Sequence, residues 1–372
     1  MSHDWPGNGY ANGNGNGNGY GNGNESGYDD EYDSGYGEPA PRRRWPRRLR
    51  RTLVVLLAVA LVGGASTYGW AWSKLNTDVD LGKVEHRPPK GKGTNYLVVG
   101  SDSRDGLSGQ DKKTLHTGSA EGRRTDSMMV LHTGAHGATL MSLPRDSWVT
   151  IPPYTYPMTG KRPGPSKNKL NAAFSAGGPE LLVRTIEHNT GLRIDHYAEI
   201  GFAGFVNVVN AVGGVHLCLD KPIKDKKSGA DLKAGCQTLD GRQALAFVRQ
   251  RHQEAKGDLG RSQNQQKFLS ALAKQAARPS QALVPWKVFP AVGAGLDTLI
   301  VDKGMDLRTL MSMFKAMQSV AGGHDRGHGN RLNVPVTGHG LATSKGSAVQ
   351  WDEARAKWLF GRLRNDQPVG RG

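Results

Sequence analysis

The pattern of apolar and polar positions divides the chain into a polar N-terminal part, one long apolar run and a region of short alternating elements. Residues 1–38 are Gly, Asn and Tyr repeats with too little apolar surface to offset the entropy of ordering, so we predict that they are disordered. Residues 52–72 contain no charged side chain over 21 positions, a length that crosses a bilayer as an α-helix. We therefore expect a cytoplasmic tail at 1–51, one transmembrane helix at 52–72 and a linker at 73–93.

The charges around the apolar run predict its orientation. Seven arginines lie between positions 42 and 51, so the positive-inside rule places the N-terminus in the cytoplasm and the part of the chain after residue 72 outside the cell membrane. The alternative is a cleaved signal peptide, but its n-region would have to be about fifty residues long, far beyond the usual size. The whole formal charge of +16 then belongs to the exported part, because residues 1–51 are nearly neutral. This charge favours anionic lipids and polymers as partners, and the topology argues against nucleic acid.

Short apolar runs and helical periodicity alternate through the rest of the chain. The runs predict strands at 95–100, 127–132, 138–143, 196–200, 215–219 and 332–336. The periodicity predicts helices at 178–187, 202–212, 239–247, 262–277, 307–320 and 353–363. The segment from 147 to 169 is rich in Pro, Tyr and Lys, and we expect a mobile loop near the ligand. The alternation predicts an α/β fold in which one α-β-α sandwich domain with a central mixed sheet spans 94–366, with its catalytic core at about 94–277.

The chain has two cysteines, Cys218 and Cys236, both in the part expected to be exported. An oxidising compartment favours a disulfide between them, which would close a loop of about eighteen residues and contribute on the order of 3 kcal/mol. Two free buried thiols are the alternative. A catalytic thiol has little support, because no histidine motif accompanies either cysteine.

Arginines and aspartates gather where the predicted strands begin and end. They are, in chain order, Asp102, Arg104, Arg124, Asp126, Arg145 and Asp146. Guanidinium forks bind phosphate oxygens and carboxylates bind divalent cations, so this mixture suits a metal-bound pyrophosphate. If the strands that carry Asp102 and Asp126 are neighbours, both carboxylates can reach one Mg²⁺ or Mn²⁺. The alternative is that Asp102 caps a turn and Asp126 pairs with Arg124.

A second cluster of arginines follows the helix predicted at 239–247. Arg249 and Arg251 are two positions apart, so in an extended segment their side chains would share one face. Together with Arg145 and Arg261 they would surround a pyrophosphate; the alternative is a solvated basic edge. The chain has no Walker glycine-lysine loop and no G-x-S-x-G elbow, which argues against P-loop and serine-hydrolase chemistry.

Taken in order, these motifs resemble the LytR-CpsA-Psr family, whose members are membrane-anchored enzymes that ligate glycopolymers to the bacterial cell wall. The resemblance covers about residues 94–366 and departs from the usual pattern at Asn210, where many members have an aspartate. The motifs that carry it are Gly100-Ser101-Asp102-Ser103-Arg104, Arg124-Thr125-Asp126, Pro144-Arg145-Asp146, Lys169-Leu170-Asn171, Val212-Gly213-Gly214-Val215 and the block with Arg249-Gln250-Arg251, Asp258, Gly260-Arg261 and Gln265-Gln266.

The resemblance implies roles for these residues. Asp102 and Asp126 would bind the metal, Arg145 would be catalytic, and Asp126 or Asp146 would accept the proton of the attacking hydroxyl. The groups that would bind pyrophosphate are Arg104, Arg124, Arg145, Arg249, Arg251, Arg261 and Gln265. The helices at 181–186 and 202–212 would line a pocket for a polyprenyl tail, or they belong to the core.

We therefore expect a metal-dependent phosphotransferase that joins a polyprenyl-pyrophosphate-linked glycopolymer to peptidoglycan. The polymer class stays open among teichoic acid, teichuronic acid, capsule and arabinogalactan, and we expect the 6-hydroxyl of N-acetylmuramic acid as the acceptor. Two other functions are compatible with the same residues. One is a pyrophosphatase that acts on the same lipids with water as acceptor, and the other is a non-catalytic regulator of the cell envelope.

Overall fold

The structure of the chain is a computed structural model that describes residues 47–117, 124–155, 160–250, 267–269, 271–272, 274–275, 293, 295–321 and 329–369. The chain divides into two compact units, Met1–Ala58 and Val59–Gly372. The sheet and the pocket described below belong to the second unit. The disorder expected at 1–38 falls outside the described residues, and the predicted domain boundaries stay predictions.

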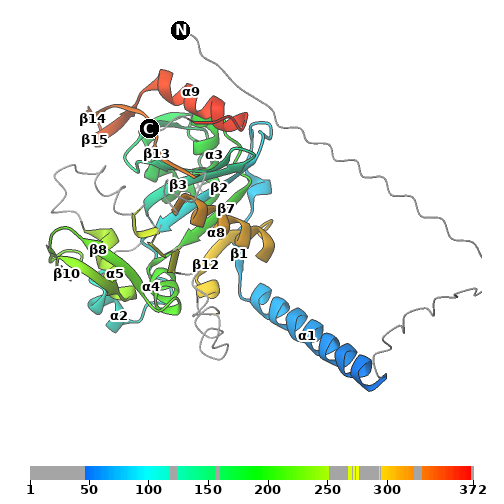
Figure 1. Ribbon diagram of the computed structural model, residues 1–372. Helices are drawn as coiled ribbons and strands as arrows, with labels where there is room; N and C mark the ends of the chain where they lie inside the picture. Colours follow the sequence, from blue (N-terminus) through cyan, green and yellow to red (C-terminus); the bar gives the residue numbers. More distant parts are fainter. Residues whose placement is uncertain are drawn as a thin grey trace, which may run out of the picture. The chain divides into compact units, whose positions relative to one another are not determined.

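The long apolar run forms a helix, as its length and composition led us to expect. It lies within α1 (Arg47–Ser73), which is labelled in Figure 1. Within the residues that the structure describes, no helix is both long enough and apolar enough to cross a membrane.

The segment after α1 is not the simple linker that we predicted for 73–93. β1 (Asn76–Val79) pairs with a strand of the main sheet, and a short 3-10 helix, η1 (Leu81–Lys83), follows it. Val79, Leu81 and Val84 are buried in the core of the domain. Three apolar residues among polar neighbours are too weak a pattern to identify an edge strand from the sequence.

A mixed sheet forms the centre of the domain (Figure 1). In the described part of the chain it has seven strands in the order β1-β12-β7-β2-β3-β4-β13. Three neighbouring pairs are parallel, namely β1 with β12, β7 with β2, and β4 with β13, and the other pairs are antiparallel. The bounds are β2 (Thr94–Ser101), β3 (Thr125–Gly134), β4 (Gly137–Leu143), β7 (His196–Ile200), β12 (Leu299–Asp302) and β13 (Asn330–Asn333).

Helices cover both faces of the sheet, so the predicted α-β-α layering is confirmed. Successive residues of β2 point to opposite faces, as in any strand. Leu97 and Val99 lie in one core cluster with α3 (Leu170–Thr190) and α9 (Glu353–Arg364). Tyr96 and Val98 lie in another with α8 (Leu307–Ala321). Each face is thus sealed by its own apolar layer.

Two segments differ from their predicted structure. α3 begins at Leu170, eight positions before the predicted start, and is kinked where Gly177 and Gly178 leave helical geometry; Gly178 has φ 67°. The expected loop at 147–169 contains a hairpin of β5 (Trp148–Ile151) and β6 (Ser166–Lys169). Val149 and Ile151 are buried, so this hairpin belongs to the core rather than to a mobile loop.

A smaller group of elements packs beside the strand ends. It comprises α2 (Gly109–Thr114), α4 (Phe202–Ala211), β8 (Val215–Leu219), β9 (Ile223–Asp225), β10 (Ala230–Leu232), β11 (Gly235–Leu239) and α5 (Gly241–Arg249). Leu217, Leu232 and Phe247 share one apolar cluster, which holds the β8–β11 and β9–β10 hairpins against α5. A last hairpin, β14 (Val336–Thr343) with β15 (Gly346–Trp351), precedes α9.

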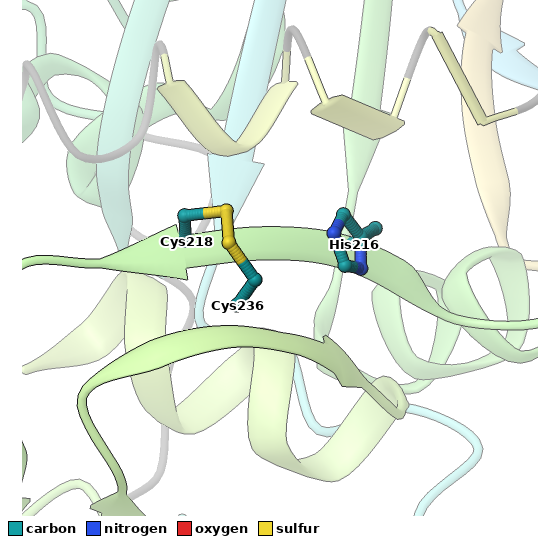
Figure 2. A group of neighbouring side chains, drawn as sticks. All are labelled: His216, Cys218 and Cys236. Carbon is teal, nitrogen blue, oxygen red and sulfur yellow. A yellow bond between two sulfur atoms is a disulfide. The ribbon is translucent and has the colours of Figure 1, made fainter.

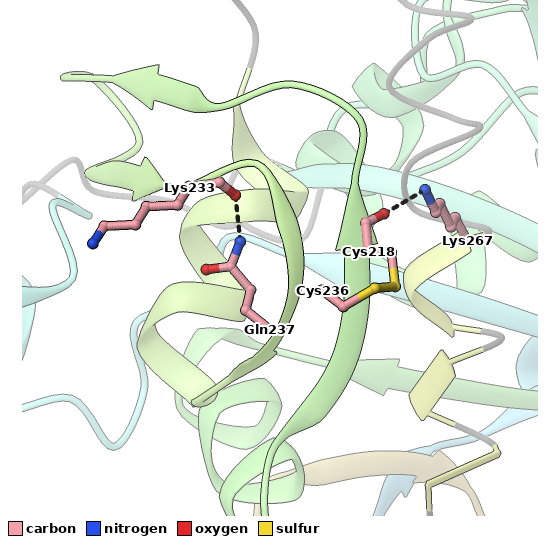
Figure 3. The surroundings of a disulfide bond; sticks show 5 residues. All are labelled: Cys218, Lys233, Cys236, Gln237 and Lys267. Carbon is pink, nitrogen blue, oxygen red and sulfur yellow. Dashed lines mark hydrogen bonds between the residues drawn. A yellow bond between two sulfur atoms is a disulfide. The ribbon is translucent and has the colours of Figure 1, made fainter.

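The two cysteines join β8 to β11. Cys218 and Cys236 face each other directly across this antiparallel pair and form a disulfide, the pairing that we predicted. Figure 2 shows His216 two positions before Cys218 on the same strand. Its ring nitrogen and the two sulfurs lie within 4.8 Å of one another, but sulfurs bonded to each other are not thiolate ligands. The Lys267 ammonium donates a hydrogen bond to the Cys218 carbonyl oxygen at 2.9 Å (Figure 3).

Removing this disulfide should lower the stability of the domain. Replacing both cysteines, Cys218→Ser with Cys236→Ser, frees an 18-residue loop in the unfolded chain. We expect a loss of about 3 kcal/mol in the free energy of unfolding, measured by urea denaturation under non-reducing conditions. An unchanged unfolding midpoint would contradict a stabilising role.

Asp366 fastens the C-terminal end of α9 to the turn between β3 and β4. Its carboxylate accepts a hydrogen bond from the Ala135 N–H at 2.7 Å and lies 3.2 Å from Nε2 of the buried His132. Burial by itself raises the pKa of Asp366, but the Ala135 N–H and the His132 ring together hold it below its ordinary value of 3.8. The folded state therefore favours the ionised form.

Asp366→Asn, which suits the positive φ of 48° at this position, should cost about 1–2 kcal/mol of stability at pH 7. The stability that ionised Asp366 contributes is present above pH 3.8 and is lost as the pH falls through the lower folded pKa. The difference between variant and wild type should therefore shrink in acid, measured by denaturation at several pH values. Asp297→Asn, at an exposed pair with Lys74, is the control and should change stability by less than about 0.5 kcal/mol. If the stability difference between Asp366→Asn and the wild type did not change with pH, the ionised carboxylate of Asp366 would not be the source of that stability.

Candidate active site

A pocket of about 590 Å³ opens where β2 ends and β3 begins. Strand ends, the β4–β5 turn, α4, α5 and the β9–β10 turn contribute its walls. Seven of the predicted site residues line it, namely Asp102, Arg104, Arg124, Asp126, Arg145, Asp146 and Arg249. The other three predicted residues, Arg251, Arg261 and Gln265, lie outside the described residues.

The antiparallel pairing of β2 with β3 places Asp102 against Arg124. Ser101 pairs with Thr125, and the ladder continues one step further because the Asp102 N–H donates to the Arg124 carbonyl at 2.8 Å. The Arg124 N–H in turn donates to Oδ1 of Asp102 at 2.7 Å. Asp102 thus closes the end of the ladder with its backbone and its side chain, and both residues lie at the pocket.

Two arginines near one aromatic ring are held by backbone carbonyls. Arg104 donates through Nε and Nη2 to the Thr117 carbonyl, at 3.0 and 2.9 Å. Arg249 donates through Nη1 to the Leu115 carbonyl at 2.9 Å and through Nη2 to the His116 carbonyl at 3.1 Å. Their Cζ atoms lie 6.0 and 4.8 Å from the ring centre of Phe202. Fixed guanidiniums lose little conformational entropy when an anion binds.

A chain of ion pairs joins four other residues of the pocket. Nη1 of Arg145 donates to Oδ1 of Asp126 at 2.7 Å, and Nε of Arg145 lies 3.4 Å from Oδ2 of Asp146. The Lys169 ammonium lies 3.2 Å from the other oxygen of Asp146. The alternative in which Asp126 pairs with Arg124 is therefore wrong, since the contact of Asp126 is with Arg145. Asp146 orients both cations through one carboxylate.

The inner wall of the pocket is apolar. Phe202 and Phe205 of α4 line it, and the ring centres of Phe205 and Phe268 are 5.2 Å apart. Ile200, Leu245, Val248 and Leu269 complete this side. The prediction that the helix at 202–212 borders a cavity is thus confirmed for its first turn. For the helix at 181–186 the structure supports the other alternative, because Leu181, Leu182, Val183 and Ile186 pack in the core of the domain.

The segment around Arg249 differs from its predicted conformation. We expected an extended stretch at 248–251, but Val248 and Arg249 form the last turn of α5, and Gln250 is the first extended residue (φ −60°, ψ 142°). A capping box between Asp240 and Gln243 starts this helix, which then continues two residues beyond the predicted end. Arg249 therefore reaches the pocket from a helix C-terminus, and the argument from alternating strand positions does not apply to it.

Several polar residues of the pocket were not predicted. They are Ser101, Lys169, Asn171, Asp225, Lys227 and Ser228. In the sequence, Ser101 has the pattern of a strand residue. In the structure, Lys169 and Asn171 lie at the junction of the β5–β6 hairpin and α3. Lys227 belongs to a lysine-rich turn that reads as a solvated loop. Ser101, Lys169 and Asn171 belong to motifs that carried the family resemblance but were given no role in the site, whereas only the packing of the β9–β10 hairpin brings Asp225, Lys227 and Ser228 to it.

Comparisons with known proteins identify the family of the chain. The model of the LytR_cpsA_psr family matches residues 70–341. A probable cell wall biosynthesis protein, LcpB of Corynebacterium glutamicum, is 42% identical over 325 residues, which cover 86% of this chain and 72% of that protein. Another relative, the cell wall biosynthesis protein LcpA of the same organism, is 33% identical, and the match covers about half of its length (48%).

More distant relatives include a polyisoprenyl-teichoic acid–peptidoglycan teichoic acid transferase, TagU of Oceanobacillus iheyensis. It is 29% identical, and the match covers 80% of this chain and 95% of that protein. Among solved structures, the LytR-Csp2A-Psr enzyme from Actinomyces oris superimposes with a TM-score of 0.55 at 20% identity, covering 78% of this chain and 96% of that one. This likeness confirms the α/β fold. By its match to the family model and to LcpB, the chain belongs to the LytR-CpsA-Psr family.

Proposed function

We propose that this protein is a phosphotransferase that ligates a polyprenyl-pyrophosphate-linked glycopolymer to peptidoglycan at the outer face of the membrane. The observation that carries the proposal is the convergence of arginines and aspartates from distant parts of the chain at one pocket with an apolar inner wall. Names of relatives point the same way, since TagU and TagT are polyisoprenyl-teichoic acid–peptidoglycan teichoic acid transferases.

The two ends of the pocket suit the two ends of a polyprenyl-pyrophosphate donor. Arg104, Arg124, Arg145 and Arg249 bring four guanidiniums to the polar end, and guanidiniums bind phosphate oxygens in a bidentate manner. The wall of Phe202, Phe205 and their apolar neighbours would cover the first isoprene units. A donor bound in this way presents its sugar-linked phosphorus at the mouth of the pocket, where a peptidoglycan hydroxyl can approach.

Catalysis then requires positioning and charge stabilisation. The acceptor hydroxyl oxygen attacks the sugar-linked phosphorus, a new P–O bond forms, and the anhydride P–O bond breaks so that polyprenyl phosphate leaves. Arg104 and Arg249 are held ready for the charge that develops on the phosphate oxygens. Asp126 or Asp146 would accept the hydroxyl proton, since both carboxylates line the pocket beside Arg145. Asp146 also contacts Lys169 and would help to position both cations.

The polar end also suits a divalent cation. Asp102 and Asp126 supply carboxylate oxygens, and Oγ of Ser101 is buried without a hydrogen-bond partner in the described structure. Hard oxygen donors beside a phosphate site are the ligands that Mg²⁺ and Mn²⁺ prefer. Asp102 and Asp126 would hold the ion. When bound, it would neutralise charge on the phosphate oxygens.

The uncharged run at 52–72 supports a position at the membrane. We propose that α1 anchors the chain as a single-pass segment with the N-terminus in the cytoplasm. The domain would then work outside the cell, within reach of a lipid donor and of peptidoglycan, and its cysteines would meet oxidising conditions.

Product analysis tests the proposed reaction. The full chain is incubated with a polyprenyl-pyrophosphate-linked polymer and peptidoglycan, and the products are separated by size. We expect polymer joined covalently to peptidoglycan through a phosphodiester. Free phosphorylated polymer as the main product would instead identify a pyrophosphatase.

Arg249→Ala should abolish most of the transfer. Loss of a positioned guanidinium that stabilises developing charge should lower the rate by at least about 100-fold. Arg242→Ala is the matched control, since Arg242 is exposed on the same helix, does not line the pocket and should leave the rate unchanged. Protein level and melting temperature are measured in parallel. Equal transfer rates for Arg249→Ala and Arg242→Ala would contradict a role of Arg249 in catalysis. Loss of polymer attachment to the wall in Arg249→Ala at a normal protein level would argue against a regulatory role.

Chelation tests the metal proposal. We expect transfer to stop in excess EDTA and to return with added Mg²⁺. Asp102→Asn keeps an oxygen that can accept from the Arg124 N–H but loses the charge, so it should raise the Mg²⁺ concentration for half-maximal rate by about 10-fold or more. Full activity in the chelator would refute metal dependence.

A further inference from the structure

The β9–β10 hairpin brings to the pocket residues that no motif assigned. Asp225, Lys227 and Ser228 line the same pocket as the arginines and the apolar wall. They lie between Cys218 and Cys236, so the disulfide closes the base of the segment that carries them. A lysine in a surface turn is ordinarily only a solvated charge. Here the surroundings of the turn argue for a defined position.

The turn is rigid and well packed. The buried carboxylate of Asp225 accepts the Lys227 N–H at 3.0 Å, and the Asp225 carbonyl accepts the Gly229 N–H at 2.9 Å. Ser228 is buried, and Leu232 of β10 packs in the apolar cluster of α5. The fold thus holds the backbone of Lys227 in place while its side chain stays exposed at the mouth of the pocket.

The turn also touches the support of Arg249. A Cβ atom added at Gly229, where φ is 77°, would lie 2.6 Å from Nδ1 of His116, so the glycine allows a close approach. The carbonyl of His116 accepts a hydrogen bond from Arg249. The hairpin, His116 and Arg249 therefore form one continuous contact, and the hairpin sits at a fixed place relative to a phosphate-binding arginine.

The charges of the pocket leave Lys227 available. Arg145 and Lys169 contact aspartates, and Arg104 and Arg249 contact carbonyls. In the described part of the structure, the Lys227 ammonium has neither an acidic nor a hydrogen-bonding partner, and Lys227 lines a pocket that already has an excess of positive charge. Cations without partners at such a place are costly unless an anion binds between them.

We infer that Lys227 is a substrate-binding residue that contacts an anionic group of the donor. The inference rests on the proposed function for the identity of the donor. Lys227 is more suited to contact the donor than the acceptor, because it lines the same pocket as the arginines and the apolar residues that would hold the donor. The acceptor needs only to approach the phosphorus. The anion is either a phosphate of the pyrophosphate or a charged group of the attached glycan.

Binding of geranylgeranyl diphosphate to the full chain, followed by titration calorimetry, tests this contact without requiring turnover. If the anion is the pyrophosphate, Lys227→Met should weaken binding about 10-fold, because one charge-assisted hydrogen bond is lost, and Lys227→Arg should restore most of it. Lys226→Met is the matched control, since Lys226 is exposed on the same hairpin but does not line the pocket, and it should bind as the wild type does. Melting temperatures confirm that all three variants fold.

Transfer kinetics distinguish the two sources of the anion. An anion on the glycan would leave diphosphate binding unchanged and raise the KM for the glycan-bearing donor about 10-fold in Lys227→Met, with kcat retained. Unchanged donor binding and donor KM, or a change in the KM for peptidoglycan alone, would overturn the inference. Wild-type protein that binds the diphosphate but transfers nothing would refute the proposed function and leave the binding test of Lys227 intact.

Discussion

The pairing of β2 with β3 is the constraint on which the site depends. It joins residues more than twenty positions apart, and the hydrogen bonds between Asp102 and Arg124, one to a backbone carbonyl and one to the Asp102 carboxylate, extend it to the mouth of the pocket. Apolar layers on both faces hold the two strands in register as far as the pair Gly100–Ser127, and the register then shifts by one residue, so that Asp126 lies between the residues paired with Gly100 and Ser101. Asp102, Arg124 and Asp126 are therefore positioned by the same core that stabilises the domain, and the polar site needs no separate scaffold.

Positively charged side chains lie close together in the pocket even when no ligand is bound. Six cationic and four acidic side chains line it among the described residues. Carbonyls and aspartates fix most of the cations, so the repulsion among them is balanced locally while a net attraction for anions remains. Apolar residues, among them Phe202 and Phe205 of α4, line the same pocket as this charge. A lipid pyrophosphate has the same division into a charged and an apolar part.

The sequence predicted the parts of the structure that depend on local patterns. Strand 95–100 and helix 202–212 were correct because alternation and helical periodicity act within a few residues. For the helix at 181–186 the sequence left pocket and core open, because a buried helix has the same pattern whether it faces a core or a cavity. Arg249 was placed in an extended segment, although α5 continues through it. Lys169 stood in a motif of the family resemblance but was given no role, and Lys227 came to the site only through long-range packing, which one sequence without an alignment does not reveal. The roles of Arg251, Arg261 and Gln265 stay predictions.

The central claim is that the charged and apolar parts of this pocket together hold a polyprenyl pyrophosphate. Native mass spectrometry of the full chain, purified from its membrane in mild detergent, tests it most directly. We expect a bound lipid whose mass corresponds to a polyprenyl chain with phosphate or pyrophosphate, and a loss of this lipid when Arg104 and Arg249 are both replaced by alanine. Protein that carries only ordinary phospholipid, or that retains the polyprenyl lipid equally well without these two arginines, would contradict it.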